Sequence, residues 1–156
     1  MTREVFKGQL EKLEDEIVGM GNAVESQLLQ AWKAMDDIDH VLAKKVISED
    51  RIINDMQRDI EAQCLTIITR QQPIAGDLRV ISAALKIVTD LERIGDHAAD
   101  IAGLVLRFED TSVAKCSPEL ENMLRESNDM VKRAIKSLID RDKELANQVL
   151  AQDDVV

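Results

Sequence analysis

The sequence predicts an all-α protein built from long antiparallel helices, and three observations support this class. Hydrophobic residues make up 45% of the 156 residues, but aromatic residues make up only 2% and tyrosine is absent. Only two prolines and six glycines are present, so long uninterrupted helices are expected. Apolar residues also recur at helical spacing from the N-terminus onward. We therefore expect a spectrin-like three-helix bundle.

The first 35 residues predict an amphipathic helix, because apolar residues recur every three or four positions. The buried side would consist of Phe6, Leu10, Leu13, Ile17, Met20, Val24, Leu28, Ala31 and Met35. The acid-rich segment Asp36–Asp39 breaks this pattern and predicts a short turn. Asp39 is the expected N-cap of the next helix.

A second helix is expected from His40 to Arg70, where apolar residues again recur at helical spacing. The sequence QQPIAG then ends it, because Pro73 biases Gln72 away from the helical region. Gly76 permits an unusual backbone angle in the same turn.

The third helix, expected over Leu78–Phe108 with Asp77 as its N-cap, is the most apolar and is predicted to be the central element. Its small residues would let neighbouring helices approach closely. Four apolar residues on one stripe are predicted to be buried: Ile87, Leu91, Ile94 and Ala98.

A linker is expected next, and Pro118 suits the first turn of a fourth helix that runs to about Asp140. A fifth helix would start near Asp142.

An internal repeat relates the two ends of the chain. Positions 31–53 and 134–156 align without a gap at an offset of 103, and eight of the 23 residues are identical. Both copies share an Asp-x-Asp turn followed by another Asp eleven residues later. We therefore predict a first three-helix bundle over 1–109, a linker over 110–118 and an incomplete second bundle over 119–156. The chain is expected to be a C-terminally truncated form that leaves apolar faces of its last helices uncovered.

The net charge of −10 and the isoelectric point near 4.7 exclude nucleic acid as an expected partner, because no basic face would neutralise phosphates. Cations or basic protein surfaces fit better. No apolar run is long enough to span a membrane, and the N-terminus lacks a signal-peptide core, so a cytoplasmic location is expected. Cys64 and Cys116 fit no zinc pattern and are expected to be reduced thiols.

Glu92, Asp96 and Asp100 lie four residues apart and would share one stripe of a helix. Like charges at this spacing repel, so we expect a positive counter-charge from a neighbouring Arg or Lys, a partner protein or a bound cation. Arg51 and Arg93 could pair with acids across the hairpin, and an acidic stripe is also often just a solvated face.

The expected hairpin about residue 74 brings more oxygen donors to the same level. At 1.5 Å per residue, Asp50 lies level with position 98 and Asn54 with position 94. Oxygen donors gathered in one band suit hard or borderline cations such as Mg²⁺, Mn²⁺ or iron. His97 is expected at the surface, and His40 is expected to cap a helix or face solvent.

Three segments of the chain resemble the PhoU family of phosphate-uptake regulators: VISEDRIINDMQRDIEAQC, QQPIAGDLRVISAALKIVTD and LERIGDHAADIA. The resemblance covers essentially the whole chain and is strongest over 71–102. It implies an all-helical pair of three-helix bundles, related by a pseudo-twofold axis, with metal-binding E/DxxxD motifs on the second and third helices of each.

Carried over residue by residue, Glu92 and Asp96 match the third-helix motif, and Asp100 extends it by one turn. Asp50 with Asn54 matches the second-helix motif, although Asn54 departs from its acidic form. In the incomplete second bundle only Asp153 corresponds to a motif residue. The implied metal set is therefore Asp50, Asn54, Glu92, Asp96 and Asp100, with Mg, Mn, Fe or Zn as the ion.

The resemblance further implies a non-enzymatic negative regulator of phosphate uptake and of the phosphate-starvation response. It would connect a phosphate ABC transporter ATPase with a sensor histidine kinase, self-associate as a homodimer or higher oligomer, and reach the inner face of the membrane only through its partners. The alternatives are a metal-dependent phosphohydrolase and a metal-binding helical scaffold. The sequence offers no P-loop and no nucleophile–base pair for the first of these.

Overall fold

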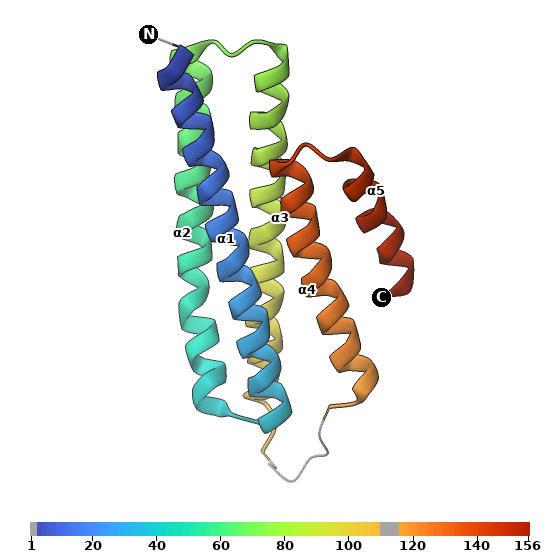
Figure 1. Cartoon of the computed structure of the whole chain (residues 1–156). Coiled ribbons are helices and arrows are strands. Elements are labelled where there is room, and N and C mark those ends of the chain that lie inside the picture. The colour runs from blue at the N-terminus through green and yellow to red at the C-terminus, as the bar shows by residue number, and fades with distance from the viewer. Residues whose placement is uncertain (1–2, 110–115) are drawn as a thin grey trace.

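The computed structural model describes residues 3–109 and 116–156 and confirms the all-α class (Figure 1). Residues 110–115, which hold most of the predicted linker, lie outside the described residues. The elements are α1 (Arg3–Asp37), α2 (His40–Gln71), α3 (Ala75–Val105), α4 (Pro118–Ile139), α5 (Lys143–Gln152) and a 3₁₀ turn η1 (Asp153–Val155).

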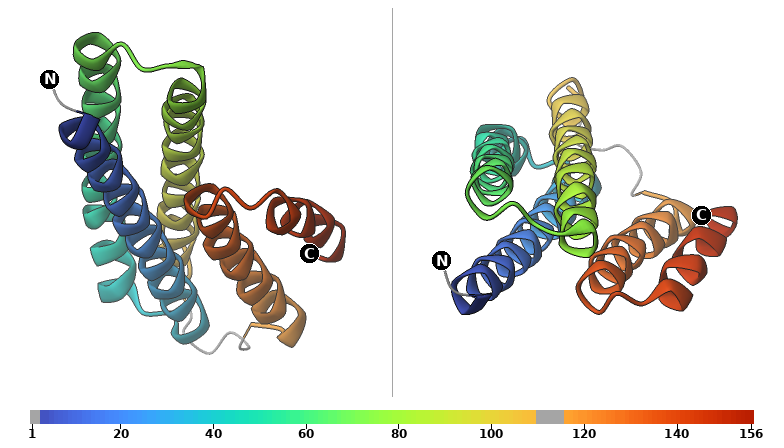
Figure 2. Two further views of the ribbon diagram at one scale, coloured as in Figure 1. Left: turned by 45° about the horizontal axis from the view of Figure 1, so that its top comes forward. Right: turned by 90° about the horizontal axis from the view of Figure 1, so that it is seen from above.

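Helices α1, α2 and α3 pack against one another along their length and form an antiparallel three-helix bundle (Figures 1 and 2). Its core is aliphatic, as the composition indicates. The largest fully buried side chains are Leu13, Ile17, Met20, Val24, Val46, Ile60, Cys64, Ile67, Ile81, Val88 and Val105. In the described part of the chain, no helix has the length and apolar character needed to cross a membrane.

The predicted N-cap of α2 is confirmed, whereas that of α3 is wrong. The Asp39 carboxylate accepts hydrogen bonds from the backbone N–H groups of Val41 and Leu42, both at 2.9 Å. Helix α3 begins at Ala75, two residues after Pro73, and Asp77 lies in its first turn. An acidic residue is favourable at either position, because the first turn also carries the positive end of the helix dipole.

In the turn between α2 and α3, the residue with an unusual backbone angle is Gln72, not Gly76 as predicted. Gly76 is helical, and Gln72, the C-cap of α2, adopts the left-handed conformation with φ 48° and ψ 60°. The chain leaves α2 at Gln72 because the following proline cannot continue the helix.

The predicted buried stripe of α3 is only partly right. Leu91 and Ala98 are buried, but Ile87 and Ile94 are half-buried. They line an apolar groove between α3 and α4 rather than the centre of the first bundle. The helix also ends at Val105, earlier than expected.

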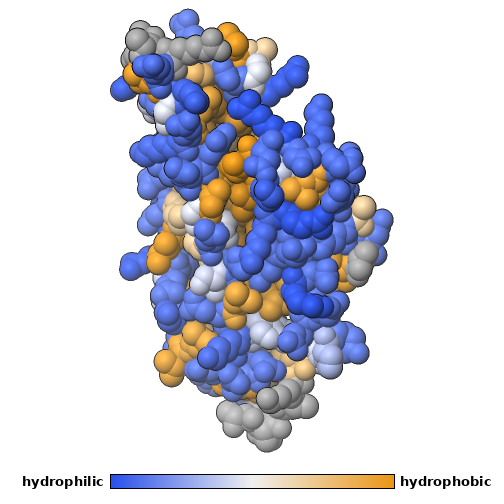
Figure 3. Space-filling model, viewed as in Figure 1, coloured by the Kyte–Doolittle hydropathy of each residue, from blue (hydrophilic) through white to orange (hydrophobic). Residues whose placement is uncertain are grey.

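Helix α4 packs on α1, and α5 packs on α4 (Figure 2). The side chain of Ile135 is buried where α4 crosses Gly21, so closely that a Cβ atom on Gly21 would collide with Ile135 Cδ1. An ion pair between Lys132 and Glu25, 2.7 Å apart, joins the same two helices. Apolar surface remains visible beside α4 in Figure 3, and α5 buries none of its residues.

The two Asp-x-Asp turns have the same backbone structure. Ile38 and Arg141, the middle residues of these turns, have φ of 49° and 53°. Asp39 N–H donates to Ala34 O at 2.8 Å, and Asp142 N–H donates to Ser137 O at 2.9 Å. The Asp142 carboxylate caps α5 as Asp39 caps α2, so the turn that joins α1 to α2 recurs between α4 and α5 at an offset of 103. The division of the chain into two bundles at 109 and 119 stays a prediction.

Candidate functional site

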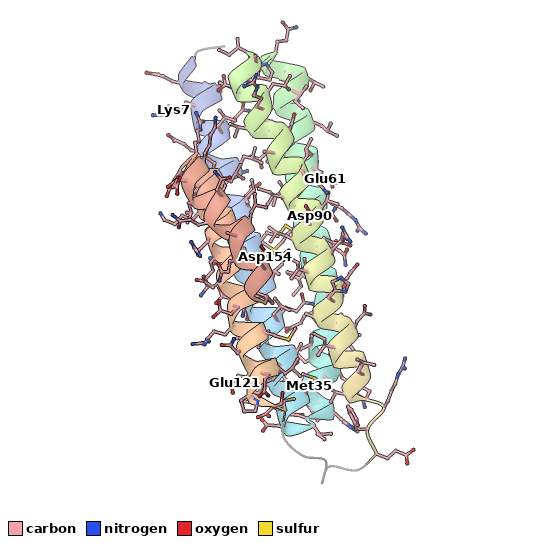
Figure 4. All side chains as sticks on the ribbon, turned by 90° about the vertical axis from the view of Figure 1, so that its right-hand side faces the viewer. Lys7, Met35, Glu61, Asp90, Glu121 and Asp154 are labelled. Atoms are coloured by element: carbon pink, nitrogen blue, oxygen red, sulfur yellow. The ribbon has the colours of Figure 1, made fainter. Side chains whose placement is uncertain are left out.

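The antiparallel pairing of α2 and α3 sets the level of the candidate residues. A Cβ atom on Gly95 would lie 3.2 Å from Ile53 Cγ2, and these two residues are equally far from residue 74. Figure 4 shows the two helices side by side, with Glu61 of α2 and Asp90 of α3 at similar heights. The structure therefore has the α2–α3 register that the sequence analysis used to place Asp50 and Asn54 level with the acids of α3. We call Asp50, Asn54, Glu92, Asp96 and Asp100 the acidic band.

Asp50 of α2 is half-buried, and amide groups hold both of its carboxylate oxygens. Gln27 Nε2 of α1 donates to Oδ1 at 3.2 Å, and Asn54 Nδ2 donates to Oδ2 at 2.9 Å. Both donors are neutral, so the carboxylate is oriented without being neutralised.

Glu92 of α3 is half-buried and lies within the field of other carboxylates. Burial raises the pKa of its carboxyl above the ordinary value of 4.5, and the negative charges of Asp96 and Asp50 raise the pKa further. Arg93 opposes this shift, and Glu61 adds to it. The raised pKa of Glu92 therefore reflects negative charge from Asp96 on its own helix and from Asp50 on α2.

The two remaining acids of the stripe are exposed. Asp100 has an exposed side chain (82%) and lies 3.9 Å from His97 Nδ1, its neighbour one turn back. His97 is exposed, as predicted. His40 does not cap α2, because Asp39 does so; its Nε2 donates to the Phe108 carbonyl oxygen at 3.1 Å.

Within residues 3–109 and 116–156, no arginine or lysine forms an ion pair with the centre of the acidic band. Arg93 pairs with Asp90 on its own helix at 3.7 Å, so the pairing across the hairpin suggested for this residue is wrong. Over the same ranges no ion pair joins α2 to α3, and none includes Asp50, Glu92 or Asp96. Among the described residues, therefore, no arginine or lysine forms the ion pair that was considered for this stripe.

The side chains of the acidic band do not converge on one point. Among the described residues, no group of three or more His, Cys, Asp or Glu side chains is placed to hold a metal ion. The donor set itself is chemically suitable, since carboxylate and amide oxygens are ligands of Mg²⁺ and Mn²⁺.

Sequence reasoning missed Gln27. Its side chain is only 5% exposed, and its Oε1 atom is buried without a hydrogen-bond partner. The signal was present in the sequence, because Gln27 stands at a core position of the first helix, between Val24 and Ala31.

The comparisons with known proteins agree with this architecture. The model of the PhoU domain matches residues 17–105 and 120–156. A PhoU homolog of Clostridium acetobutylicum, named as a phosphate-specific transport system accessory protein, is 39% identical over all of this chain and 72% of its own length. A protein of the same name from Pseudomonas aeruginosa is 35% identical over 97% of this chain and 63% of its own length.

Solved structures show the same fold. The crystal structure of the phosphate transport system regulatory protein PhoU from Streptococcus pneumoniae superposes with a TM-score of 0.87, at 28% identity over 96% of this chain and 70% of that one. The crystal structure of PhoU from Pseudomonas aeruginosa gives a TM-score of 0.86 at 34% identity, over 96% of this chain and 72% of that one. With the family model matched on both sides of the linker and the fold shared, the chain belongs to the PhoU family.

Proposed function

We propose that this protein is a negative regulator of phosphate uptake and of the phosphate-starvation response. The observation that carries the proposal is membership of the PhoU family across both segments of the chain. The relatives are named as accessory proteins of a phosphate-specific transport system. The chain spans 72% of the length of one of these relatives and 63% of the length of the other. Because it covers only part of them, the activity of the full-length proteins is a proposal for this chain.

The proposed mechanism is binding rather than catalysis. Long helical faces would dock on the ATPase of a phosphate ABC transporter and on a sensor histidine kinase, in the cytoplasm. Purified protein should therefore capture both partners in pull-down experiments, and its expression should lower phosphate-starvation reporter activity in a strain that lacks its own regulator. Capture of neither partner, together with an unchanged reporter, would contradict the adaptor role.

We further propose that the acidic band binds a divalent or ferric ion. Three features support this: the half-buried Glu92 carboxyl with its raised pKa, the neutral amides around Asp50, and the family motif. Because the side chains are not gathered around one point, binding requires the exposed Asp96 and the half-exposed Glu92 to turn toward Asp50. Asp100 would bind from the adjacent turn.

Calorimetric titration with Mn²⁺ tests this site. Glu92→Gln combined with Asp96→Asn should abolish binding, since it removes two charged donors while keeping the size of the side chains. Asp55→Asn combined with Asp59→Asn is the matched control, because both acids are exposed on α2. Equal binding by the wild type and the Glu92/Asp96 variant would show that the cation, if bound, lies elsewhere.

We also propose self-association through the apolar faces of α4 and α5. Among their exposed apolar side chains are those of Met123 (45% exposed) and Leu150 (73% exposed). Burying such side chains stabilises an interface by roughly 1.5–3 kcal/mol each when fully covered.

A further inference from the structure

Gln27 is a buried polar side chain at the meeting point of three helices. It projects from α1, its Nε2 donates to Asp50 Oδ1 on α2 at 3.2 Å, and its Oε1 approaches Gly95 on α3. A Cβ atom on Gly95 would lie 3.0 Å from Oε1, so the glycine leaves room for the amide. Gly95 is buried and lies between Glu92 and Asp96 in the sequence, so the amide contacts α3 next to the residues of the acidic stripe and contacts Asp50 directly.

The packing of the bundle alone does not account for a glutamine here. Its Oε1 atom is buried without a donor, and an acceptor in that state lowers the stability of the fold. If the offset of 103 that relates the two turns is extended along the preceding helices, the residue of α4 equivalent to Gln27 of α1 is Met130. Met130 is half-buried and lines the groove between α3 and α4, so the equivalent position of α4 holds an apolar side chain of similar length.

Gln27 differs from Met130 in that it contacts a carboxylate, that of Asp50. The Nε2 group fixes the direction of Asp50 Oδ1, while Asn54 fixes Oδ2 from the next turn of α2. A neutral donor can hold a carboxylate in place without competing with a cation for its charge. Donors of this kind behind a ligand commonly set metal affinity.

We propose that Gln27 is a positioning residue of the acidic band, which orients Asp50 for a cation at some expense of the stability of the bundle. The inference rests on the proposed binding of a metal ion to the band. It assigns to α1 a part in a site whose family motif lies on the second and third helices.

Gln27→Met tests the assignment in the full chain, with Mn²⁺ as the probe. The variant should bind Mn²⁺ about 10–100-fold more weakly, as is usual when a group behind a ligand is lost. Its denaturation midpoint in EDTA should stay equal or rise, because the unpartnered Oε1 is removed. Gln30→Met is the control: it makes the same change one turn later, where the side chain donates only to Ser26 of its own helix.

The outcomes separate this inference from the proposed function. Wild-type binding with unchanged affinity in Gln27→Met overturns the role of Gln27 and leaves the metal site standing. If Gln27→Met lowers both the Mn²⁺ affinity and the denaturation midpoint in EDTA, the proposal is also overturned, because a purely structural side chain would give that pattern. Gln27→Leu should give the same result as Gln27→Met, which shows that the effect does not depend on how one particular side chain fits. Absence of binding by the wild type overturns the metal site and the inference together.

Discussion

At the residue scale, the Glu92 carboxyl makes the stability of the metal-free protein depend on pH. Burial and the neighbouring carboxylates raise its pKa above 4.5, so the folded state binds its proton more tightly than the unfolded state does. The stabilising contribution is complete below pH 4.5 and is lost as the pH rises through the folded-state pKa.

Glu92→Gln should therefore reduce the loss of stability as the pH rises above 4.5. Chemical denaturation in EDTA at several pH values measures this, with Glu144→Gln on the exposed start of α5 as the control. The expectation fails if the wild type and Glu92→Gln show the same slope.

The two thiols should differ in reactivity. Cys64 is fully buried, and burial raises the pKa of its thiol to about 11, whereas Cys116 is only half-buried, although burial and the Asp36 carboxylate also raise the pKa of its thiol. A disulfide reagent should thus modify Cys116 in the native protein and reach Cys64 only on unfolding. Cys116→Ser should remove the native reaction, and a remaining fast phase would contradict the buried position of Cys64.

At the scale of elements, periodicity predicted the helices well and their ends less well. Asp39 could be recognised as a cap because it directly precedes an apolar helical pattern. Asp77 also precedes an apolar helical pattern, but helix α3 already begins at Ala75, two residues after Pro73, so Asp77 lies inside the helix. For the site, spacing predicted the shared level of α2 and α3, whereas Gln27 was missed because its partner Asp50 lies on another helix.

Truncation should distinguish a fully buried residue of α3 from a half-buried one on the same stripe. Leu91 is 3% exposed, so Leu91→Ala should lower the free energy of unfolding by ~2–5 kcal/mol. Ile94→Ala should lower it less, because Ile94 is half-buried and lines the groove toward α4. Urea denaturation gives both values, and an equal loss at the two positions would show that the groove is closed in solution.

The repeated caps offer a matched pair at the same scale. Asp39→Ala should lower global stability by ~0.5–2 kcal/mol, because α2 belongs to the core of the first bundle. Asp142→Ala should instead loosen α5 locally, since α5 buries no residue. Hydrogen exchange reports both effects, and a global shift from Asp142→Ala would mean that α5 is part of the main cooperative unit.

At the scale of the whole molecule, α4 packs on α1 along a seam, and apolar side chains of α4 and α5 remain exposed outside it. The seam includes the contact of Ile135 with Gly21 and the ion pair between Lys132 and Glu25. The predicted second bundle would account for this apolar surface, because α4 and α5 align with α1 and α2, whose corresponding faces are covered by α3. Sequence reasoning could anticipate these faces, but not that α4 would use α1 as a partial cover.

Light scattering should therefore show a mass above that of a monomer, which increases with protein concentration. Met123→Gln combined with Leu150→Lys should reduce this mass, because both side chains belong to the exposed apolar surface of α4 and α5. Val41→Lys is the control, since Val41 is 80% exposed and belongs to α2 rather than to α4 or α5. A monomeric wild type whose amides are fully protected over 118–149 would contradict the proposal, because the seam with α1 would then be sufficient to order α4 and α5 within one chain.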